Sequence, residues 1–395
     1  MNTILIKIGK SWQVIKRDGI INGGRRVLSA FFALFQSVSS GDILFISGGV
    51  GDSALYRTRH VAEELEFNGF KCAVAVQDNP FLTSYVNKFS IFIFHRTLYT
   101  EKIQKIIKEI KKQNKTIIFE TDDLVYDPKY LKYMDYYQKM NNLERKLYEN
   151  GVGGEILRDD YVKVATTTTK FLANKLQEED KKVFIVPNKL SVEDVKNAKE
   201  ACSDRLKTCN CKQGVIKLGY FSGTISHNKD FATITEPLVT IMEKYQNTEL
   251  LLVGPLDIES ELAQRFADRI KQLPYVKRSK HFANITKCDI NLAPLEYNNP
   301  FCEAKSELKF FEAGIVKIPT IVIDNQTYRD TISDGKDGFV AGNSKEWIDK
   351  LSKLIENKEL RIQMGEKAYQ KTIKNYTTQN AKNLKYYKYL KSNLK

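Results

Sequence analysis

The sequence predicts an α/β protein of two tandem domains, each with a parallel sheet that carries helices on both faces. Short β-rich runs alternate with longer amphipathic stretches from about residue 41, and the same alternation restarts near residue 215. This rhythm is typical of strand–helix–strand units, in which the helix returns the chain so that the next strand runs parallel. A length of 395 residues is enough for two domains with separate cores.

The first half supplies strands and helices in regular alternation. The expected strands are residues 42–47, 71–76, 89–95 and 115–120. The expected helices are residues 57–69 and 100–113, in which apolar side chains recur at helical spacing. These elements predict a parallel sheet in this half.

The second half repeats the pattern. Its expected strands are residues 215–221, 248–253, 288–295 and 318–324, and its expected helices are residues 231–245 and 303–314. Between the halves, polar, charged and cysteine-bearing residues interrupt the periodicity. The predicted organisation is an N-terminal domain at 1–190, a linker at 191–214, a C-terminal domain at 215–370 and a terminal helix at 371–395.

Composition restricts the class of protein. The formal net charge of +14 favours contact with polyanions such as nucleic acid, an anionic bilayer or phosphorylated substrates, although lysine-rich helices can exist without such a partner. No apolar run reaches the roughly 18 to 20 residues of a membrane-spanning helix, and no signal peptide is recognised, so a cytoplasmic location is predicted. Cys202, Cys209 and Cys211 lack a fourth ligand nearby and make a poor zinc site.

Residues 303–314, with the sequence EAKSELKFFEAG, read as one helix just before a buried strand. Lys305 and Glu312 would then share a face, two turns apart. Because ligands in such sheets sit beyond the strand ends, where a helix begins with unpaired N–H groups, this segment could hold a diphosphate. The N–H groups expected to face it are those of Ser306, Glu307 and Leu308. The alternative is a solvated helix whose lysines and glutamates pair.

Residues 305–324, KSELKFFEAGIVKIPTIVID, resemble the nucleotide-binding segment of glycosyltransferase family 4, the retaining enzymes with the GT-B fold. Glu312 matches the glutamate that binds the ribose of the nucleotide sugar in that family. Ala304 stands where the family has an earlier glutamate, and Lys317 stands where a helix-ending glycine is usual.

Two further segments of the second half resemble the same family. Residues 219–231, GYFSGTISHNKDF, look like its first strand and turn, in which an arginine and a lysine face the diphosphate. Lys229 matches the lysine, whereas Thr224, after Gly223, occupies the arginine position. Lys305 could replace the missing cation. Gly254 lies in LLLVGPL, which resembles the next strand and its glycine turn.

In the first half, residues 47–70 resemble the family's glycine-rich loop and first helix. Gly48, Gly49 and Gly51 allow a close approach of the backbone to a ligand, or form a plain turn. Arg57 could reach a phosphate or the acceptor, or form a surface ion pair. His95 could face the acceptor cleft or be a buried core histidine.

Asp122 and Asp123 are, with Lys229, the candidate catalytic residues. The segment IIFETDDLVYD matches a form found in family members that act on bacterial surface polysaccharides, and the aspartates lie where many relatives carry a histidine. They could orient or deprotonate an acceptor hydroxyl, or merely cap a turn at the strand end.

The resemblance implies a GT-B fold, two Rossmann-like domains whose parallel sheets face each other across a cleft, with the terminal helix crossing back to the first domain. It implies a nucleoside-diphosphate sugar as donor on the C-terminal domain and a glycan or lipid-linked glycan as acceptor on the N-terminal one. No cofactor and no metal are expected, because lysines and helix N-termini can neutralise the leaving diphosphate.

Two basic amphipathic segments indicate what the protein could bind besides its substrates. Residues 23–38 and the lysine- and tyrosine-rich tail could rest on an anionic bilayer, or could pack within the fold. A nucleic-acid partner is not expected. The alternative functions are a GT-B enzyme that makes a small soluble glycoside and a non-catalytic basic module that binds nucleic acid or membrane.

Overall fold

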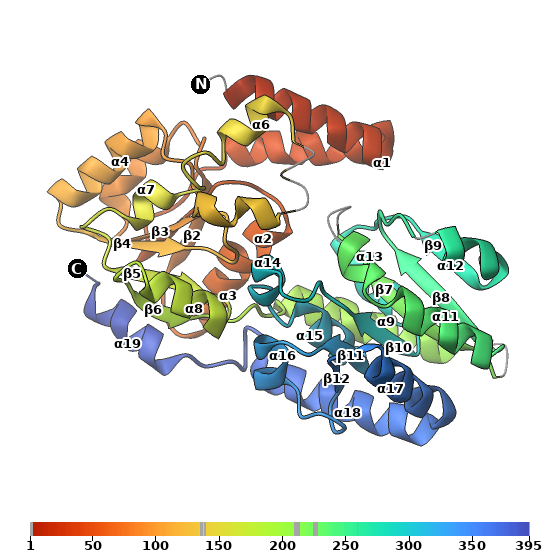
Figure 1. Ribbon diagram of the computed structural model, residues 1–395. Coiled ribbons are helices and arrows are strands. Elements are labelled where there is room, and N and C mark those ends of the chain that lie inside the picture. Colours follow the sequence, from red (N-terminus) through yellow and green to blue (C-terminus); the bar gives the residue numbers. More distant parts are fainter. Residues whose placement is uncertain are drawn as a thin grey trace. The chain divides into compact units, whose positions relative to one another are not determined.

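The computed structural model describes residues 3–134, 137, 140–208, 214–223, 228–258 and 260–394. The chain divides into two units, Met1–Lys189 with Lys382–Lys395, and Leu190–Ala381. Each unit contains a six-stranded sheet in which every neighbouring pair of strands is parallel (Figure 1). The predicted α/β class with two parallel sheets is confirmed.

The sheet of the first unit has the order β2-β1-β3-β4-β5-β6. Its strands are β1 (Ile43–Ser47), β2 (Cys72–Val76), β3 (Ile91–His95), β4 (Thr116–Glu120), β5 (Val164–Thr167) and β6 (Lys182–Ile185). Its helices are α1 (Thr3–Leu34), α2 (Asp52–Ala54), the π-helical η1 (Leu55–His60), α3 (Val61–Phe67), η2 (Leu82–Lys88), α4 (Glu101–Lys112), η3 (Pro128–Tyr133), α6 (Asn142–Lys146), α7 (Gly154–Leu157), α8 (Lys170–Gln177) and α19 (Leu384–Ser392).

Helix α4 shows how the local sequence specifies these elements. Thr100 caps its N-terminus by accepting a hydrogen bond from the N–H group of Ile103. Isoleucines at helical spacing then face the sheet, and all of them are buried: Ile103, Ile106, Ile107 and Ile110. The opposite face carries lysines and glutamates, as an amphipathic helix on a sheet requires.

The C-terminal helix α19 belongs to the first unit although the preceding residues belong to the second. Tyr386, Tyr387 and Leu390 are buried in the core cluster that also contains Phe45 and Ile93. The hydroxyl group of Tyr387 donates a hydrogen bond to the buried Glu64. The tail is therefore held by apolar packing and by a polar contact.

The sheet of the second unit has the order β12-β11-β10-β7-β8-β9. Its strands are β7 (Ile216–Phe221), β8 (Thr248–Val253), β9 (Ile270–Leu273), β10 (Ile290–Ala293), β11 (Thr320–Ile323) and β12 (Phe339–Ala341). Its helices are α9 (Val192–Thr208), α10 (Asn228–Ala232), α11 (Thr235–Lys244), α12 (Ser260–Arg265), η5 (Ala267–Arg269), α13 (Arg278–Ile285), α14 (Pro300–Glu303), α15 (Leu308–Gly314), α16 (Gln326–Thr331), α17 (Ser344–Glu356) and α18 (Lys358–Asn375).

The prediction of a linker at residues 191–214 is wrong for most of that range. Helix α9 occupies Val192–Thr208 and packs against α13, with Ala198 and Ala201 buried. Ser191 and Asp194 cap its N-terminus reciprocally: the N–H group of Asp194 donates to Ser191 Oγ at 3.1 Å, and that of Ser191 to Asp194 Oδ2 at 3.3 Å. The SVED sequence carried this signal. Cys209 and Cys211 lie outside the described residues.

The packing of α18 against the end of α15 generates a prediction about stability. A Cβ atom on Gly365 would lie 2.2 Å from the carbonyl oxygen of Lys317, which has a left-handed backbone with φ of 61°. Gly365→Ala should destabilise the protein by about 2 kcal/mol, although alanine is the better helix former by about 1 kcal/mol. Thermal and denaturant unfolding would measure the loss.

Gly24→Ala in α1 is the matched control, because a Cβ atom there meets nothing within 4 Å. Its stability should equal or slightly exceed that of the wild type. Equal stability of both variants would contradict the close contact between Gly365 and the Lys317 carbonyl.

Candidate functional site

The stretch 303–314 is not one helix, contrary to the prediction. Helix α14 ends at Glu303 and α15 begins at Leu308, with Lys305 in the loop between them. Asn299 caps α14 by accepting a hydrogen bond from Phe301 N, so the first helix has its own start signal. Lys305 and Glu312 therefore do not share a helical face.

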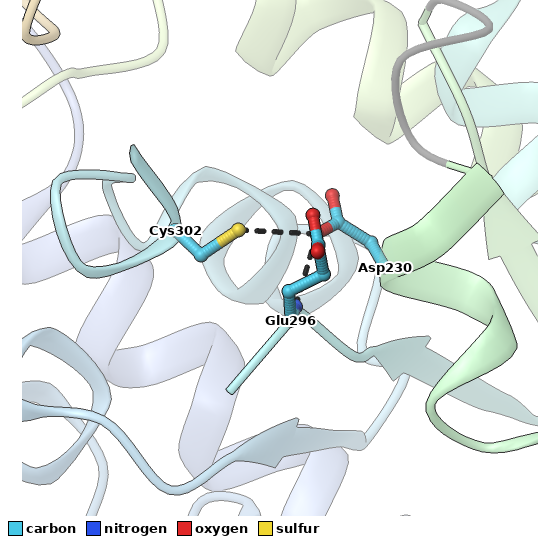
Figure 2. Close-up of side chains that lie close together, drawn as sticks. All are labelled: Asp230, Glu296 and Cys302. Carbon is cyan, nitrogen blue, oxygen red and sulfur yellow. Dashed lines mark hydrogen bonds between the residues drawn. The ribbon is translucent and has the colours of Figure 1, made fainter. Parts of the chain in front are cut away.

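The loop instead brings Lys305 to a buried carboxylate on α10. Lys305 Nζ lies 2.6 Å from Asp230 Oδ2. The other oxygen of Asp230 accepts hydrogen bonds from Cys302 Sγ at 3.2 Å and from the N–H group of Glu296 at 3.1 Å (Figure 2). The sequence analysis missed Asp230, which directly follows the predicted Lys229. The ion pair between Asp230 and Lys305 could not be predicted from the sequence, because the two residues lie far apart in the chain and meet only in the folded protein.

Asp230, Glu296 and Cys302 point toward one another in Figure 2, and one ligand atom from each lies within 4.8 Å of the others. Burial and the nearby Asp230 charge raise the pKa of the Cys302 thiol to about 12, so it is protonated near neutral pH, whereas metals bind the thiolate. The ammonium group of Lys305 already balances Asp230. The arrangement therefore fits an anchor for Lys305 better than a cation site.

A second lysine, Lys309 on α15, lies at the carboxyl end of β7. Its Nζ donates a hydrogen bond of 2.9 Å to the carbonyl of Phe221 and stands 3.9 Å from the centre of the Tyr220 ring. Loss of hydration, aided by the charge of Lys305, lowers the pKa of Lys309 to about 7. The sequence analysis did not choose it as a ligand, although it lies one turn before Glu312.

Glu312 is buried and both of its carboxylate oxygens are engaged. Arg278 NH1 contacts Oε1, and His281 Nε2 lies 3.1 Å from Oε2. Arg278 also binds Asp194 of α9, with Nε 2.9 Å from Oδ1 and NH2 3.1 Å from Oδ2. Each carboxylate oxygen has a second lone pair, so ribose hydroxyl groups could still donate to Glu312. Asp194, Arg278 and His281 were not predicted.

The remaining predicted donor residues differ in exposure. Gly223 and Lys229 are exposed, Ser306 and Leu308 are half-buried, and Glu307 is buried. Thr224 lies outside the described residues. Gly254 has a φ of 96°, and a Cβ atom there would lie 2.0 Å from the carbonyl oxygen of Ser222. Only glycine allows the loops after β7 and β8 to approach so closely.

In the first unit, the strand register brings the predicted residues His95, Asp122 and Asp123 to one edge of the sheet. Ser47 pairs with His95, and His95 with Glu120, so the loops after β1, β3 and β4 leave the same edge of the sheet. Asp122 Oδ2 accepts a hydrogen bond of 2.7 Å from Ser53 Oγ, which also lies 3.1 Å from His95 Nε2. The structure thus joins Asp122 and His95 through Ser53, a residue that the sequence analysis missed.

Arg96 binds both aspartates. Its Nε lies 2.6 Å from Asp122 Oδ1, and its NH2 contacts Asp123 Oδ2. Burial favours protonation of Asp122, but the charge of Arg96 and the hydrogen bond from Ser53 lower its pKa below the usual value. Burial and the neighbouring Asp122 charge raise the pKa of Asp123, and Arg96 only partly offsets them. Asp123 is the carboxylate better suited to accept a proton near neutral pH.

Arg57 cannot contact an acceptor, contrary to the prediction. The side chain is fully buried and binds Glu120 through two hydrogen bonds of 3.0 and 2.9 Å. Its NH1 donates to the carbonyl of Val186 at 2.7 Å and to Asn188 Oδ1 at 3.0 Å. The surface ion pair considered from the sequence is wrong as well, because both partners are in the interior. His95 is the buried core histidine of the alternative interpretation.

The glycine-rich loop needs only one of its three glycines for steric reasons. A Cβ atom on Gly48 would lie 1.9 Å from the carbonyl oxygen of Arg96, whereas Gly49 and Gly51 have open space. Gly48 thereby lets the loops after β1 and β3 touch, and its N–H group donates to the His95 carbonyl at 2.9 Å.

The comparisons identify the class of protein. Residues 216–371 match the family model described as Glycosyl transferases group 1. No curated protein sequence matches the chain. Within the described residues, no helix combines the length and the hydropathy needed to cross a bilayer.

Solved structures match nearly the whole chain at low identity. A glycosyltransferase from Rickettsia africae is 15% identical with a TM-score of 0.60, over 90% of this chain and 100% of that one. Sucrose-phosphate synthase from Thermosynechococcus elongatus is 13% identical with a TM-score of 0.58, over 85% and 95%. HepE from Anabaena, solved with UDP-glucose, is 12% identical with a TM-score of 0.57, over 89% and 98%.

These matches confirm the predicted GT-B fold. The second unit contains a glycosyl transferase group 1 domain, so the prediction of a glycosyltransferase is confirmed at the level of its class. Membership of family 4, a retaining reaction and a role in surface polysaccharides stay predictions.

The buried His95 predicts acid sensitivity of the fold. Burial lowers its pKa from 6.5 to about 3, so the native state keeps it neutral while the unfolded chain takes up a proton below about pH 6.5. Stability is therefore lost as the pH falls from 6.5 toward 3. His95→Gln should reduce the loss between about pH 7.5 and about pH 5 by about 2 kcal/mol.

Denaturant unfolding at both pH values would measure this difference. His95→Gln retains a polar group that Ser53 can contact, so the variant is expected to fold. An equal acid-induced loss in wild type and variant would show that His95 titrates normally in the folded protein.

Proposed function

We propose that the protein transfers a sugar from a nucleoside-diphosphate donor, bound by the second unit, to a glycan or lipid-linked glycan acceptor, bound by the first. The observation that carries the proposal is the convergence of Lys305, Lys309 and Glu312 on the carboxyl end of the sheet, within the region that matches the family model. Cations and a hydrogen-bond acceptor there suit a diphosphate and a ribose. The Anabaena neighbour was solved with UDP-glucose, which favours a UDP-sugar as the first donor to test.

In this proposal the two lysines stabilise the charge that develops on the leaving diphosphate. Asp230 fixes Lys305 by a 2.6 Å ion pair, so its ammonium group is positioned before the substrate arrives. Lys309 adds a cation whose charge depends on pH near neutrality. Lys229, exposed on α10, supplies a third positive group. With these charges the reaction is proposed to need no metal.

The acceptor half of the proposal rests on the first unit. Asp122, held ionised by Arg96, would orient an acceptor hydroxyl group, and Asp123 would accept its proton or position it. A retaining reaction in the synthesis of a bacterial surface polysaccharide is the proposed context. Contact with an anionic membrane at the cytoplasmic face would bring a lipid-linked acceptor to this unit.

The proposal predicts donor binding that depends on Glu312. Wild-type protein should gain thermal stability with one nucleotide sugar from a panel of UDP, GDP, ADP, CMP and dTDP sugars. Glu312→Ala should weaken that binding by about 10- to 100-fold, because hydrogen bonds to a buried carboxylate contribute about 1.5–3 kcal/mol. Thermal shift identifies the donor and calorimetry measures its affinity.

Glu303→Ala is the matched control, since it removes an acid from the same segment outside the Arg278 network. EDTA should leave binding and transfer unchanged. No stabilisation by any nucleotide sugar would overturn the proposal and favour the alternative of a non-catalytic binding module.

Lys309 predicts the pH dependence of donor binding. Its pKa of about 7 in the free protein means that the ammonium form, which a diphosphate requires, is lost as the pH rises. Affinity for UDP-glucose, whose diphosphate does not titrate in this range, should fall by up to about tenfold per pH unit above 7. Lys309→Met should bind more weakly at pH 6 and show a flat profile.

Lys353→Met controls for the loss of a surface charge, because Lys353 is exposed on α17 and pairs with Asp349 one turn away on the same helix. Its affinity and pH profile should match those of the wild type. A flat profile in the wild-type protein would mean that Lys309 does not contact the donor diphosphate.

A further inference from the structure

The first helix, α1, and the residue that follows it carry a concentration of exposed apolar side chains. Seven of the sixteen large hydrophobic residues that are exposed in the described part of the chain lie between residues 12 and 35. They are Trp12, Ile20, Ile21, Leu28, Phe31, Phe32 and Phe35. Ile20 is 83% exposed and Phe32 is 69% exposed, so these side chains are not edges of a buried core. Contiguous apolar surface of this kind marks an interaction site.

The exposed side chains beyond the kink in α1 form one stripe. The helix bends at Gly19, whose φ is 79° and ψ is 163°. With about 100° of rotation per residue, positions 20, 21, 28, 31, 32 and 35 fall within an arc of about 120°. Residues 23, 27, 30 and 34, which are buried or half-buried, lie together on the adjacent side of the helix, within an arc of about 60°. Figure 1 draws α1 in red on the outside of the first unit.

Three aromatic rings of this apolar stripe lie close to one another. Phe31 lies edge-on to Phe32 and to Phe35, with ring centroids 6.2 and 5.2 Å apart. Arg25 is exposed at the border of the stripe, next to the exposed Ser29 and Gln36. An apolar arc with an arginine and polar groups at its margin suits insertion of this face into a membrane interface.

The positive charge of residues 1–38 favours an anionic partner for α1. Residues 1–38 contain six basic side chains and one acidic side chain, Asp18. A second copy of this chain would bring two such positive segments together, which electrostatic repulsion opposes. An anionic bilayer would attract the basic side chains and accept the apolar stripe at the boundary between headgroups and acyl chains.

We propose that α1 docks the protein on an anionic lipid surface, with the stripe at residues 20–35 inserted and Arg25 at the headgroups. This inference rests on the proposed function only in assigning a purpose, the delivery of a lipid-linked acceptor. Binding to lipid itself needs neither the donor nor the reaction.

The test uses the full chain with vesicles of phosphatidylcholine, with and without phosphatidylglycerol. The wild type should co-sediment with the anionic vesicles and lose binding at high salt. The double variant Phe31→Ser/Phe32→Ser and the single variant Arg25→Glu should each bind at least about tenfold more weakly.

Phe67→Ser/Phe81→Ser is the matched control, since both side chains are 50% exposed outside α1. It should bind vesicles as the wild type does. Unchanged vesicle binding by the α1 variants would overturn the inference, as would a wild-type dimer that Phe31→Ser/Phe32→Ser converts to a monomer. Calorimetry with UDP-glucose on the same variants separates the two proposals, because loss of lipid binding should leave donor affinity unchanged.

Discussion

Buried carboxylates at the carboxyl ends of the parallel strands are the constraint on which both units depend. A carboxylate removed from water must find a cation or several hydrogen-bond donors. Asp230 finds Lys305 in the second unit, and Glu120 finds Arg57 in the first. Each pair joins elements that are distant in the sequence, so the same contacts that neutralise a charge also fix the loops at the strand ends.

This constraint assigns different tasks to cations of similar appearance. Arg57 donates hydrogen bonds to Glu120, Val186 and Asn188 in the interior and therefore stabilises the fold. Lys305 keeps part of its side chain in solvent while Asp230 holds it, which suits a group that meets a ligand. Arg96 is intermediate, since it ties two partly exposed aspartates together. Burial and the number of partners, rather than residue type, separate structural cations from functional ones.

Two glycines are required where neighbouring loops at the strand ends come into close contact. Gly48 and Gly254 lie where the loop after one strand touches the loop after its neighbour, and a Cβ atom would collide with a carbonyl oxygen in both cases. Gly49, Gly51 and Gly223 have open space around them. The composition of the loop after β1 suggested three equivalent glycines, but contact with a neighbouring loop is a property of the folded chain.

The sequence by itself determined the two parallel sheets, because strand and helix periodicities are local and alternate clearly. It also located the segment around Glu312, through a resemblance that the family model supports over residues 216–371. It did not reveal helix α9, although the SVED capping signal was present, because the polar and charged composition of residues 191–214 is also typical of a linker. The partners of Lys305, Arg57 and Glu312 were decided only by the tertiary structure, since a side chain's partner depends on which distant loops the sheet register brings to the same edge.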